Sequence, residues 1–297
     1  MFLVVTSGAF VRLTASGLGC AHWPRCGTAP FPTQGNKHAI IEFSNRIVAL
    51  VGIALTLVAW LASRKREGLS GLARTCALGA FLGALAQIPL GGVTIILKLH
   101  PLAVMSHFLL ALVVLAFSLV IFLEAWGAAA GRAPAFDPAW ARQVVVWAGL
   151  PLAAALVVTG AVATASGPHP GSAKGVHRLG ISIVDTVYVH VRVAAAFGIG
   201  FLLLGVLVWR SRAVLPGVLR IWGGTLAVLV AQMILGEVQY RNALPWGLVL
   251  LHVFLAAAIW SLAVTLAHVL WRPPAALAAA AGRAPVAPAG VGHAVRE

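Results

Sequence analysis

The sequence is poor in charged residues, and in acidic residues above all. Only 9% of its 297 residues are charged, and Asp and Glu together number 7 against 21 Lys and Arg. A soluble domain carries about 25% charged residues, so a chain that is 61% hydrophobic is too apolar for a water-soluble fold. We therefore expect an integral membrane protein with several helices.

The sequence also lacks the basic stripes and aromatic-interleaved loops of nucleic-acid-binding proteins. Its net charge of +14 would suit a nucleic-acid partner, but the basic residues lie in short connections between apolar runs. That distribution is typical of membrane proteins. We therefore predict no nucleic-acid partner.

Cysteine is scarce, with three residues in the whole chain. Cys76 lies in an apolar run, where we expect it to pack as a small hydrophobic residue. Cys20 and Cys26 flank five residues of a polar connection. Their chemistry therefore depends on which side of the membrane this connection occupies.

Long apolar runs are abundant. Seven runs of about 20 residues predict membrane-spanning helices: 38–63, 73–97, 101–125, 142–165, 185–209, 220–240 and 245–271. Residues 1–11 are apolar too, but they make half a span and lack the basic start of a signal peptide. We therefore predict an all-α membrane protein of eight transmembrane helices, and we expect the chain to begin inside the first one.

The positions of Lys and Arg predict the orientation. Twelve lie in one set of connections and in the tail, and nine lie in the opposite set. The excess predicts a cell-membrane protein with a cytoplasmic C-terminus, which leaves the Cys20–Cys26 connection outside. Six tryptophans at helix ends on the predicted cytoplasmic side agree with this orientation: Trp60, Trp126, Trp140, Trp209, Trp222 and Trp271.

An internal repeat divides the chain. LAQIPLGGV at 85–93 recurs as VAQMILGEV at 230–238, an offset of 145 residues, and the segment 5–17 recurs in shortened form at 158–167. Each half thus has four helices. Because an even number of helices returns the chain to the same side, we predict parallel repeats related by an axis along the membrane normal.

The repeat and the composition together predict four segments. Residues 1–125 form an N-terminal four-helix half, and 142–272 form a C-terminal four-helix half. A cytoplasmic linker at 126–141 joins them. Residues 273–297 consist mainly of Ala, Pro and Gly and are predicted to form a disordered tail.

The same offset relates four intramembrane positions. His107 corresponds to His252, and His190 corresponds to Asn45. Each position lies five to seven residues in from the start of its predicted helix, about 10 Å deep at 1.5 Å per residue. Matched depth on the second and fourth helices of each half is the arrangement that axial ligation of a haem by two imidazoles requires.

A bare metal is the alternative to haem. A zinc or di-iron site needs three or four close ligands, often with carboxylates, whereas the C-terminal half offers His190 and His252 alone. A single histidine on an apolar helix is more often a satisfied core residue, but a repeat-related set favours ligation. We therefore predict one bis-histidine haem site in the C-terminal half. An altered site at His107 and Asn45 is predicted in the N-terminal half.

Glu42 and Arg46 lie at the edge of a predicted membrane helix, where an ionisable group costs about 2.5–3.5 kcal/mol and is a functional candidate. They also stand in the i, i+4 order in which they can neutralise each other. The repeat favours a functional role, because Glu42 is one helical turn from position 45. His38 shares this face, and either supports Glu42 or is solvated at the helix end.

Several basic residues on the predicted outer side are candidate partners of haem propionates. For any single one of them, interfacial snorkelling is the commoner explanation. The candidates are Arg12, Lys37, Arg46, Lys174, Arg178 and Arg192.

Five groups of residues, in this order, resemble the haem A synthase family of cytochrome oxidase assembly over residues 1–272. They are the segment 8–20 with Trp23-Pro24 and Cys26, the segment Glu42-Phe43-Ser44-Asn45-Arg46, the segment Leu99-His100-Pro101 with His107-Phe108, the segment Ser166-Gly167-Pro168-His169, and the pair His190 and His252.

The resemblance implies a haem b in the C-terminal half, held by His190 and His252, that relays electrons. It implies an N-terminal half that takes haem O and oxidises a ring methyl to a formyl group, giving haem A. Glu42 is implied as the catalytic carboxylate, as a proton acceptor or an electrostatic stabiliser. The family motif Glu-x-x-His reads Asn at position 45, which leaves His107 to ligate the substrate haem with Asn45 and Arg46 beside it.

The resemblance further implies a disulfide between Cys20 and Cys26 on the oxidising side of the membrane. It implies haem O synthase and cytochrome oxidase assembly proteins as partners, within membrane lipid. Gly79 and Gly83 allow close helix packing within one chain or between chains, so a homo-oligomer is a further candidate assembly.

Two other functions compete with this one. A b-type electron-transfer cytochrome would need both haems six-coordinate, and Asn45 argues against that. A haem carrier could also be built from parallel repeats. However, Pro89 has Ile234 as its counterpart, so the helices are not broken at matching places in the two halves.

Overall fold

The computed structural model describes residues 1–20, 23–26, 32, 36–173 and 176–278. Every regular element in these residues is helical. The elements are α1 (Phe2–Leu13), α2 (Lys37–Lys65), α3 (Gly71–Ile96), α4 (Pro101–Ala130), α5 (Ala139–Val144), the π-helical turn Val145–Gly149, α6 (Leu150–Ser166), α7 (Ile183–Arg210), α8 (Pro216–Arg241), α9 (Trp246–Trp271) and the 3₁₀ turn Ala275–Leu277.

The predicted all-α membrane class is confirmed. Seven helices in the described part are long and apolar enough to cross a membrane, with α5, the π-helical turn and α6 joined into one span over Ala139–Ser166. Helix α1 is apolar but has 12 residues, which is too short to span a bilayer. The chain is therefore a multi-pass membrane protein.

Side chains in the connections cap the N-termini of α2 and α3. Asn36 accepts a hydrogen bond from the backbone N–H of Ala39 at 3.0 Å, and Ser70 accepts one from Ala73 at 3.1 Å. Both are N-cap contacts that satisfy a free N–H of the first turn. Pro101 opens α4, at a position where its missing N–H costs nothing.

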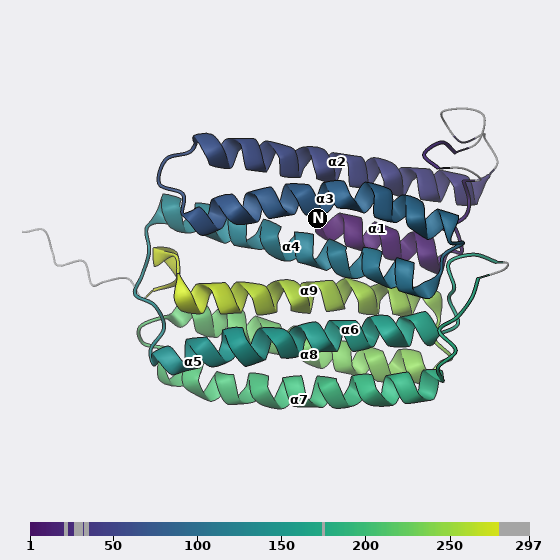
Figure 1. The fold of residues 1–297 in the computed structure, drawn as a ribbon. Coiled ribbons are helices and arrows are strands. Elements are labelled where there is room, and N and C mark those ends of the chain that lie inside the picture. Colours follow the sequence, from purple (N-terminus) through teal and green to yellow (C-terminus); the bar gives the residue numbers. More distant parts are fainter. Residues whose placement is uncertain (21–22, 27–31, 33–35, 174–175, 279–297) are drawn as a thin grey trace, which may run out of the picture.

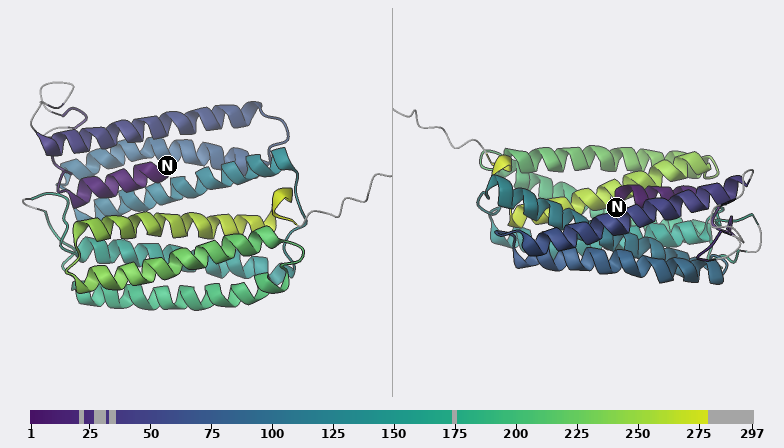
Figure 2. Two further views of the ribbon diagram at one scale, coloured as in Figure 1. Left: turned by 180° about the vertical axis from the view of Figure 1, so that it is seen from behind. Right: turned by 90° about the horizontal axis from the view of Figure 1, so that it is seen from above.

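The helices form two groups that lie side by side (Figure 1). Helices α1 to α4 make one group and α5 to α9 make the other, with α4 and α9 adjacent where the groups meet. Two further views show the same arrangement (Figure 2). We call the end of the bundle at which α1 ends and α2, α4, α7 and α9 begin the Cys20 end. The opposite end is the Glu124 end.

Contacts between α1, α4 and α9 join the two groups. Trp260 Nε1 donates a hydrogen bond of 2.9 Å to the carbonyl oxygen of Leu112. The rings of Phe2 and Phe254 pack edge to face, with 4.9 Å between their centroids. These contacts place α1 directly against the first half of α9.

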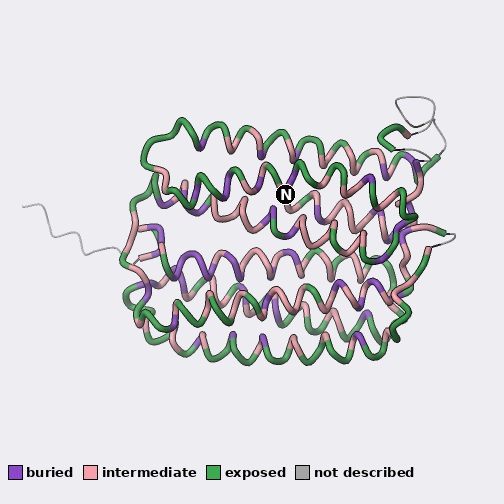
Figure 3. The backbone as a smooth tube through the Cα atoms, in the orientation of Figure 1, coloured by how far each residue is buried: buried purple, intermediate pink, exposed green. Residues whose placement is uncertain are grey.

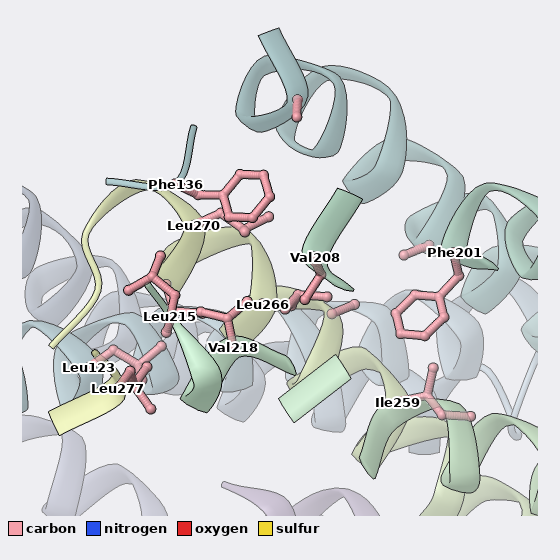
Figure 4. Packing of buried hydrophobic residues seen from close by; sticks show 14 of the residues in the cluster. Leu123, Phe136, Phe201, Val208, Leu215, Val218, Ile259, Leu266, Leu270 and Leu277 are labelled. Carbon is pink, nitrogen blue, oxygen red and sulfur yellow. The ribbon is translucent and has the colours of Figure 1, made fainter. Parts of the chain in front are cut away.

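The exterior of the bundle is apolar, as a lipid environment requires. The outer faces of α2 and α7 are largely exposed, whereas the second half of α9 is largely buried (Figure 3). A large hydrophobic cluster surrounds that buried half at the Glu124 end (Figure 4). Its members come from α4 to α9, from the connections before α5 and α8 and from the last 3₁₀ turn, and include Phe136, Leu215 and Leu270.

Two predicted boundaries need correction. Helix α4 continues to Ala130 and stops at Gly131, whose φ of 77° lies in the region that favours glycine, so helix occupies the first part of the predicted linker 126–141. Residues 273–278 are packed rather than disordered: Pro273, Pro274 and Leu277 are buried. The remainder of the predicted tail lies outside the described residues.

Candidate functional site

His190 and His252 lie against neighbouring helices in the C-terminal half. Thr159 Oγ1 on α6 is 3.1 Å from His190 Nδ1. A Cβ on Gly160 would lie 3.0 Å from His190 Cε1, and one on Gly236 would lie 3.3 Å from His252 Cε1. Each imidazole therefore uses the space that a glycine leaves on the adjacent helix.

The N-terminal half has the corresponding contacts. Ser7 Oγ on α1 donates a hydrogen bond of 2.7 Å to Asn45 Oδ1 on α2. A Cβ on Gly91 of α3 would lie 3.5 Å from Cε1 of His107 on α4. Asn45 and His107 thus make contacts similar to those of His190 and His252.

A glutamine side chain bonds to the backbone of His107, and another bonds to the backbone of His252. Gln87 Nε2 donates to the carbonyl oxygen of His107 at 3.1 Å, and Gln232 Nε2 donates to that of His252 at 3.0 Å. Such a side chain-to-backbone bond holds adjacent helices in register, α3 with α4 and α8 with α9.

The imidazoles of His107 and His252 leave nitrogens free for a ligand. Their Nδ1 atoms are buried and have no hydrogen-bond partner among the described residues. An unpaired buried polar group is costly and calls for a partner.

This donor set fits a haem. In the described part of the chain, no three or more His, Cys, Asp or Glu side chains gather into a metal-binding group. A haem brings four nitrogens of its own, so it needs one or two imidazoles from the protein. The pair in the C-terminal half and the single histidine in the N-terminal half meet that need.

A cavity of about 630 Å³ lies at the Cys20 end of the C-terminal half. Its walls come from the end of α6, the start of α7 and the end of α8, and include Ser166, Gly167, Ile183 and Tyr240. His169 Nε2 bonds to the carbonyl oxygen of Leu244 at 2.7 Å, next to the same cavity.

Glu42 is nearly buried, with 5% of its surface exposed, and both of its carboxylate oxygens are engaged. Arg46 Nη2 donates to Oε1 at 2.5 Å, and the backbone N–H of Cys20 donates to Oε2 at 2.8 Å. Arg46 Nη1 donates to the carbonyl oxygen of Pro24 at 2.8 Å. The i, i+4 pair expected from the sequence is therefore formed, and it also binds the preceding connection.

The disulfide between Cys20 and Cys26 is formed, as the sequence predicts. It closes a loop that places the Trp23 ring over Gly92 of α3, where an added Cβ would lie 3.2 Å from the ring. Gly92 adjoins Gly91, the glycine beside His107. The loop is thus fastened to both α2 and α3 at the N-terminal pocket.

Other candidates from the sequence have different partners. His38 Nδ1 lies 2.9 Å from Ser16 Oγ, so its hydrogen bond goes to Ser16 rather than to Glu42. The guanidinium of Arg192 lies 3.0 Å from the centroid of the Tyr188 ring. Lys37 is exposed at the start of α2. Lys174 lies outside the described residues.

A second buried carboxylate, Glu124 on α4, was not predicted from the sequence and is 0% exposed. Arg272 Nε donates to its Oε1 at 2.7 Å, Arg132 Nη2 lies 3.0 Å from its Oε2, and Ser70 Oγ also donates to it. His268 Nε2 lies 3.1 Å from Oε1, although the sequence suggested no role for this residue. A carboxylate inside an apolar run was the signal, the same signal that identified Glu42.

A family comparison gives this geometry an identity. The model of a family described as cytochrome oxidase assembly protein (COX15-CtaA) matches residues 1–264. The chain belongs to this family. The matched range includes every candidate haem ligand, Glu42 and both bonded cysteines.

Individual relatives support this family membership. A protein of Symbiobacterium thermophilum named Heme A synthase is 35% identical over 125 residues, which cover 41% of this chain and 40% of the relative. A Heme A synthase of Bacillus cereus is 30% identical over 125 residues, 41% of this chain and 39% of the relative.

A longer sequence match is to a protein that carries a different name. Protoheme IX farnesyltransferase of Thermus thermophilus is 28% identical over 284 residues, which cover 89% of this chain and 46% of the relative. The chain thus spans about half the length of the curated relatives that it matches over most of its own length.

Proposed function

We propose that this family member is a membrane haem A synthase. It oxidises a ring methyl of haem O to a formyl group in the N-terminal half, and a haem b in the C-terminal half relays the electrons. The observation that carries the proposal is the recurrence of one set of contacts around positions 45 and 107 and around positions 190 and 252.

Three contacts support the predicted repeat of two parallel four-helix halves. The glutamine bonds at His107 and His252 lie 145 residues apart, as do the glycines beside the two rings. The third is the hydroxyl on the first helix of each half: Ser7 bonds position 45, and Thr159 bonds position 190. A substrate haem and a resident haem of similar shape require two pockets with similar contacts.

In the C-terminal half, His190 and His252 would hold the haem b. When bound, this group supplies one-electron redox chemistry. The protein's part is to position the two imidazoles. Thr159 orients His190 through its Nδ1 atom, Gly160 and Gly236 let the rings lie close to the helices, and Gln232 fixes the backbone of His252.

In the N-terminal half, His107 would ligate the iron of the substrate haem. Asn45 faces Ser7, and an amide oxygen is a poor iron ligand, so the substrate iron keeps one histidine. Weaker ligation suits a molecule that must enter and leave. The electron-carrying haem, which stays, keeps two histidines.

Glu42 acts as an electrostatic stabiliser beside the methyl group that is oxidised. Oxidation of the methyl carbon builds positive character, which a carboxylate in a low-dielectric site stabilises more than in water. Because Arg46 and the Cys20 N–H both donate to Glu42, the carboxylate is held in one position. A fixed position is what an electrostatic stabiliser requires.

The Cys20 end lies on the outer side of the membrane and the C-terminus lies in the cytoplasm. The excess of Lys and Arg at the Glu124 end supports this orientation. Trp126, Trp209 and Trp271, near the ends of α4, α7 and α9, support it as an interfacial belt at the same end. The disulfide at the opposite end is consistent with an oxidising exterior.

A protohaem farnesyltransferase is the partner that supplies the substrate. Farnesylation of protohaem gives haem O, the compound that the proposed reaction consumes. The matched Thermus thermophilus proteins carry that name, and more than half of their length lies outside the match. Cytochrome oxidase assembly proteins are the proposed recipients of haem A, and self-association through small residues of α3 is a further proposed contact.

The test is to express the full chain in a host that makes haem O and lacks haem A, and to identify the extracted haems by chromatography. We expect haem A with the wild type and haem O alone with His107→Ala. Unchanged haem O with the wild type would overturn the synthase proposal. If a low-spin haem were present in that case, a b-type electron carrier or a haem carrier would replace the synthase as the proposed function.

A further inference from the structure

Two arginines from different halves meet on one backbone carbonyl at the Cys20 end. Arg12 Nη2 of α1 donates to the oxygen of Thr164 at 2.6 Å, and Arg178 Nη2, from the connection between α6 and α7, donates to the same oxygen at 2.9 Å. Arg178 also donates to the carbonyl oxygen of Gly167. Two guanidinium groups are thus held side by side at the end of α6.

These two cations have no counter-ion among the described residues. The carboxylates that form ion pairs, Glu42, Glu124 and Glu237, pair with other side chains. Like charges held together repel each other, and burying a charge without a partner is costly. Burial lowers the pKa of the Arg178 guanidinium, which is the direction expected for an uncompensated cation.

Capping of α6 does not account for both arginines. Basic side chains often bond to the last carbonyls of a helix, and one guanidinium would suffice for this end. In addition, the Nε atom of Arg178 and the Oγ atom of Ser166 are buried and have no hydrogen-bond partner among the described residues. Spare donors and surplus positive charge at one place indicate a site for an anion.

The site lies one helical turn from a candidate haem ligand. Gly160, which contacts the ring of His190, and Thr164 are four residues apart and share one face of α6. At 1.5 Å per residue, Thr164 is about 6 Å nearer the Cys20 end. The cavity lined by Ser166 and Gly167 lies at this level. The two arginines are therefore placed to hold an acidic side chain of a haem that His190 would bind.

We propose that Arg12 and Arg178 form one carboxylate-binding subsite, and that it takes a propionate of the haem held by His190 and His252. The inference rests on the proposed haem b site. Its consequence is that α1 of the N-terminal half helps to bind the haem of the C-terminal half. A lipid phosphate has related chemistry, but Arg178 bonds to Gly167, which lines the cavity of about 630 Å³ at the Cys20 end of the C-terminal half, and this favours the propionate.

The first measurement is the midpoint potential of the low-spin haem in the purified holoprotein. A nearby positive charge favours the reduced haem, so Arg12→Gln and Arg178→Gln should each shift the potential to more negative values, with the low-spin spectrum retained. Arg12→Lys and Arg178→Lys keep the charge and should shift it less. Arg212→Gln, at an exposed arginine that lies over Trp209 at the Glu124 end, is the control and should leave the potential unchanged.

The second measurement compares protohaem with its dimethyl ester, which lacks the carboxylates, in membranes of a haem-deficient host. The wild type should bind protohaem about tenfold more tightly than the ester. The Gln variants should lose most of that preference. If they weakened both ligands equally, the arginines would merely cap α6 and the inference would be overturned.

Two further outcomes are also decisive. An unchanged preference together with loss of co-purified anionic phospholipid, seen by native mass spectrometry, would assign the site to a lipid headgroup and overturn the propionate. A wild-type protein without any low-spin haem would overturn the proposed haem b site and this inference with it. A low-spin haem that shows no preference for protohaem would overturn this inference alone.

Discussion

The hydroxyl of Ser7 donates a hydrogen bond of 2.7 Å to Oδ1 of Asn45, across the interface of α1 and α2. The hydroxyl of Thr159 lies 3.1 Å from Nδ1 of His190, across the interface of α6 and α7. In each half the first helix thus orients the polar side chain of the next helix. The N-terminal half has this orienting hydroxyl although position 45 carries an amide instead of an imidazole.

Asn45→His should therefore restore a bis-histidine site in the N-terminal half. Ser7 can accept a hydrogen bond from Nδ1–H of the new ring, as Thr159 can from His190, and this leaves Nε2 for iron. We expect tighter haem O binding and a change of the bound substrate iron from five-coordinate high spin to six-coordinate low spin. Optical and electron paramagnetic resonance spectra measure the change.

The matched control for this prediction is Ser7→Ala in the Asn45→His background, which should make the new ligation heterogeneous without removing it. If Asn45→His abolished haem O binding and His107→Ala did not, the assignment of the N-terminal pocket would be wrong.

The spans could be predicted because a membrane helix needs a long apolar run and little else. The seven long helices match the predicted runs to within a few residues at most ends. The exceptions come from local chemistry that hydropathy does not register. The alanines at 128–130 extend α4 up to Gly131, and Pro273 and Pro274 fold back onto the bundle, where Ala275 N–H donates to the Gly131 carbonyl oxygen at 2.9 Å.

The candidate site could be predicted as far as its proposed ligands repeat in the sequence. The 145-residue offset identifies His107, His190 and His252 and shows that Asn45 is the exception. It cannot show that Arg12 meets Arg178, because their meeting depends on how α1 packs against the connection between α6 and α7. Residues that come from distant segments and meet in space do not recur at a fixed interval in the sequence.

Glu42→Gln should lower haem A production by about 100-fold while haem O stays bound, since removal of one electrostatic stabiliser costs about 10²–10³ in kcat. The amide keeps the shape of the side chain and can still accept the Cys20 N–H, but it no longer carries charge. The measurement is the ratio of haem A to haem O in extracts, with bound haem O measured in the same membranes. Production at the wild-type level would leave Glu42 as an ion-pair partner of Arg46 alone.

Glu124→Ala should destabilise the protein by about 3–5 kcal/mol, because it removes the partner of a buried ion pair and leaves other charges uncompensated. Arg132 and Arg272 would lose their carboxylate, and the end of α9 would lose its link to α4. Thermal unfolding in detergent, followed by tryptophan fluorescence, measures the loss.

The control for Glu124 is Glu237→Ala. Glu237 pairs with Arg241 on the surface of α8, where the two side chains are 59% and 75% exposed, and such pairs contribute about 0–1 kcal/mol. Equal effects of the two substitutions would show that the Glu124 cluster contributes no more than an exposed pair.

Gly236→Val should displace the ring of His252 and weaken the haem b site. An added Cβ would already lie 3.3 Å from Cε1 of His252, so the two methyl groups of valine must push the ring away from α8. We expect loss of low-spin haem from the purified protein, measured by its pyridine haemochrome content and its optical spectrum.

Gly223→Val is the matched control, because it makes the same change on the same helix at a position with no atom within 4 Å of the added Cβ. Both substitutions alter helix propensity alike, so a difference between them reports on the ring alone. Equal haem content in the two variants would mean that His252 does not hold a haem through this face of α8.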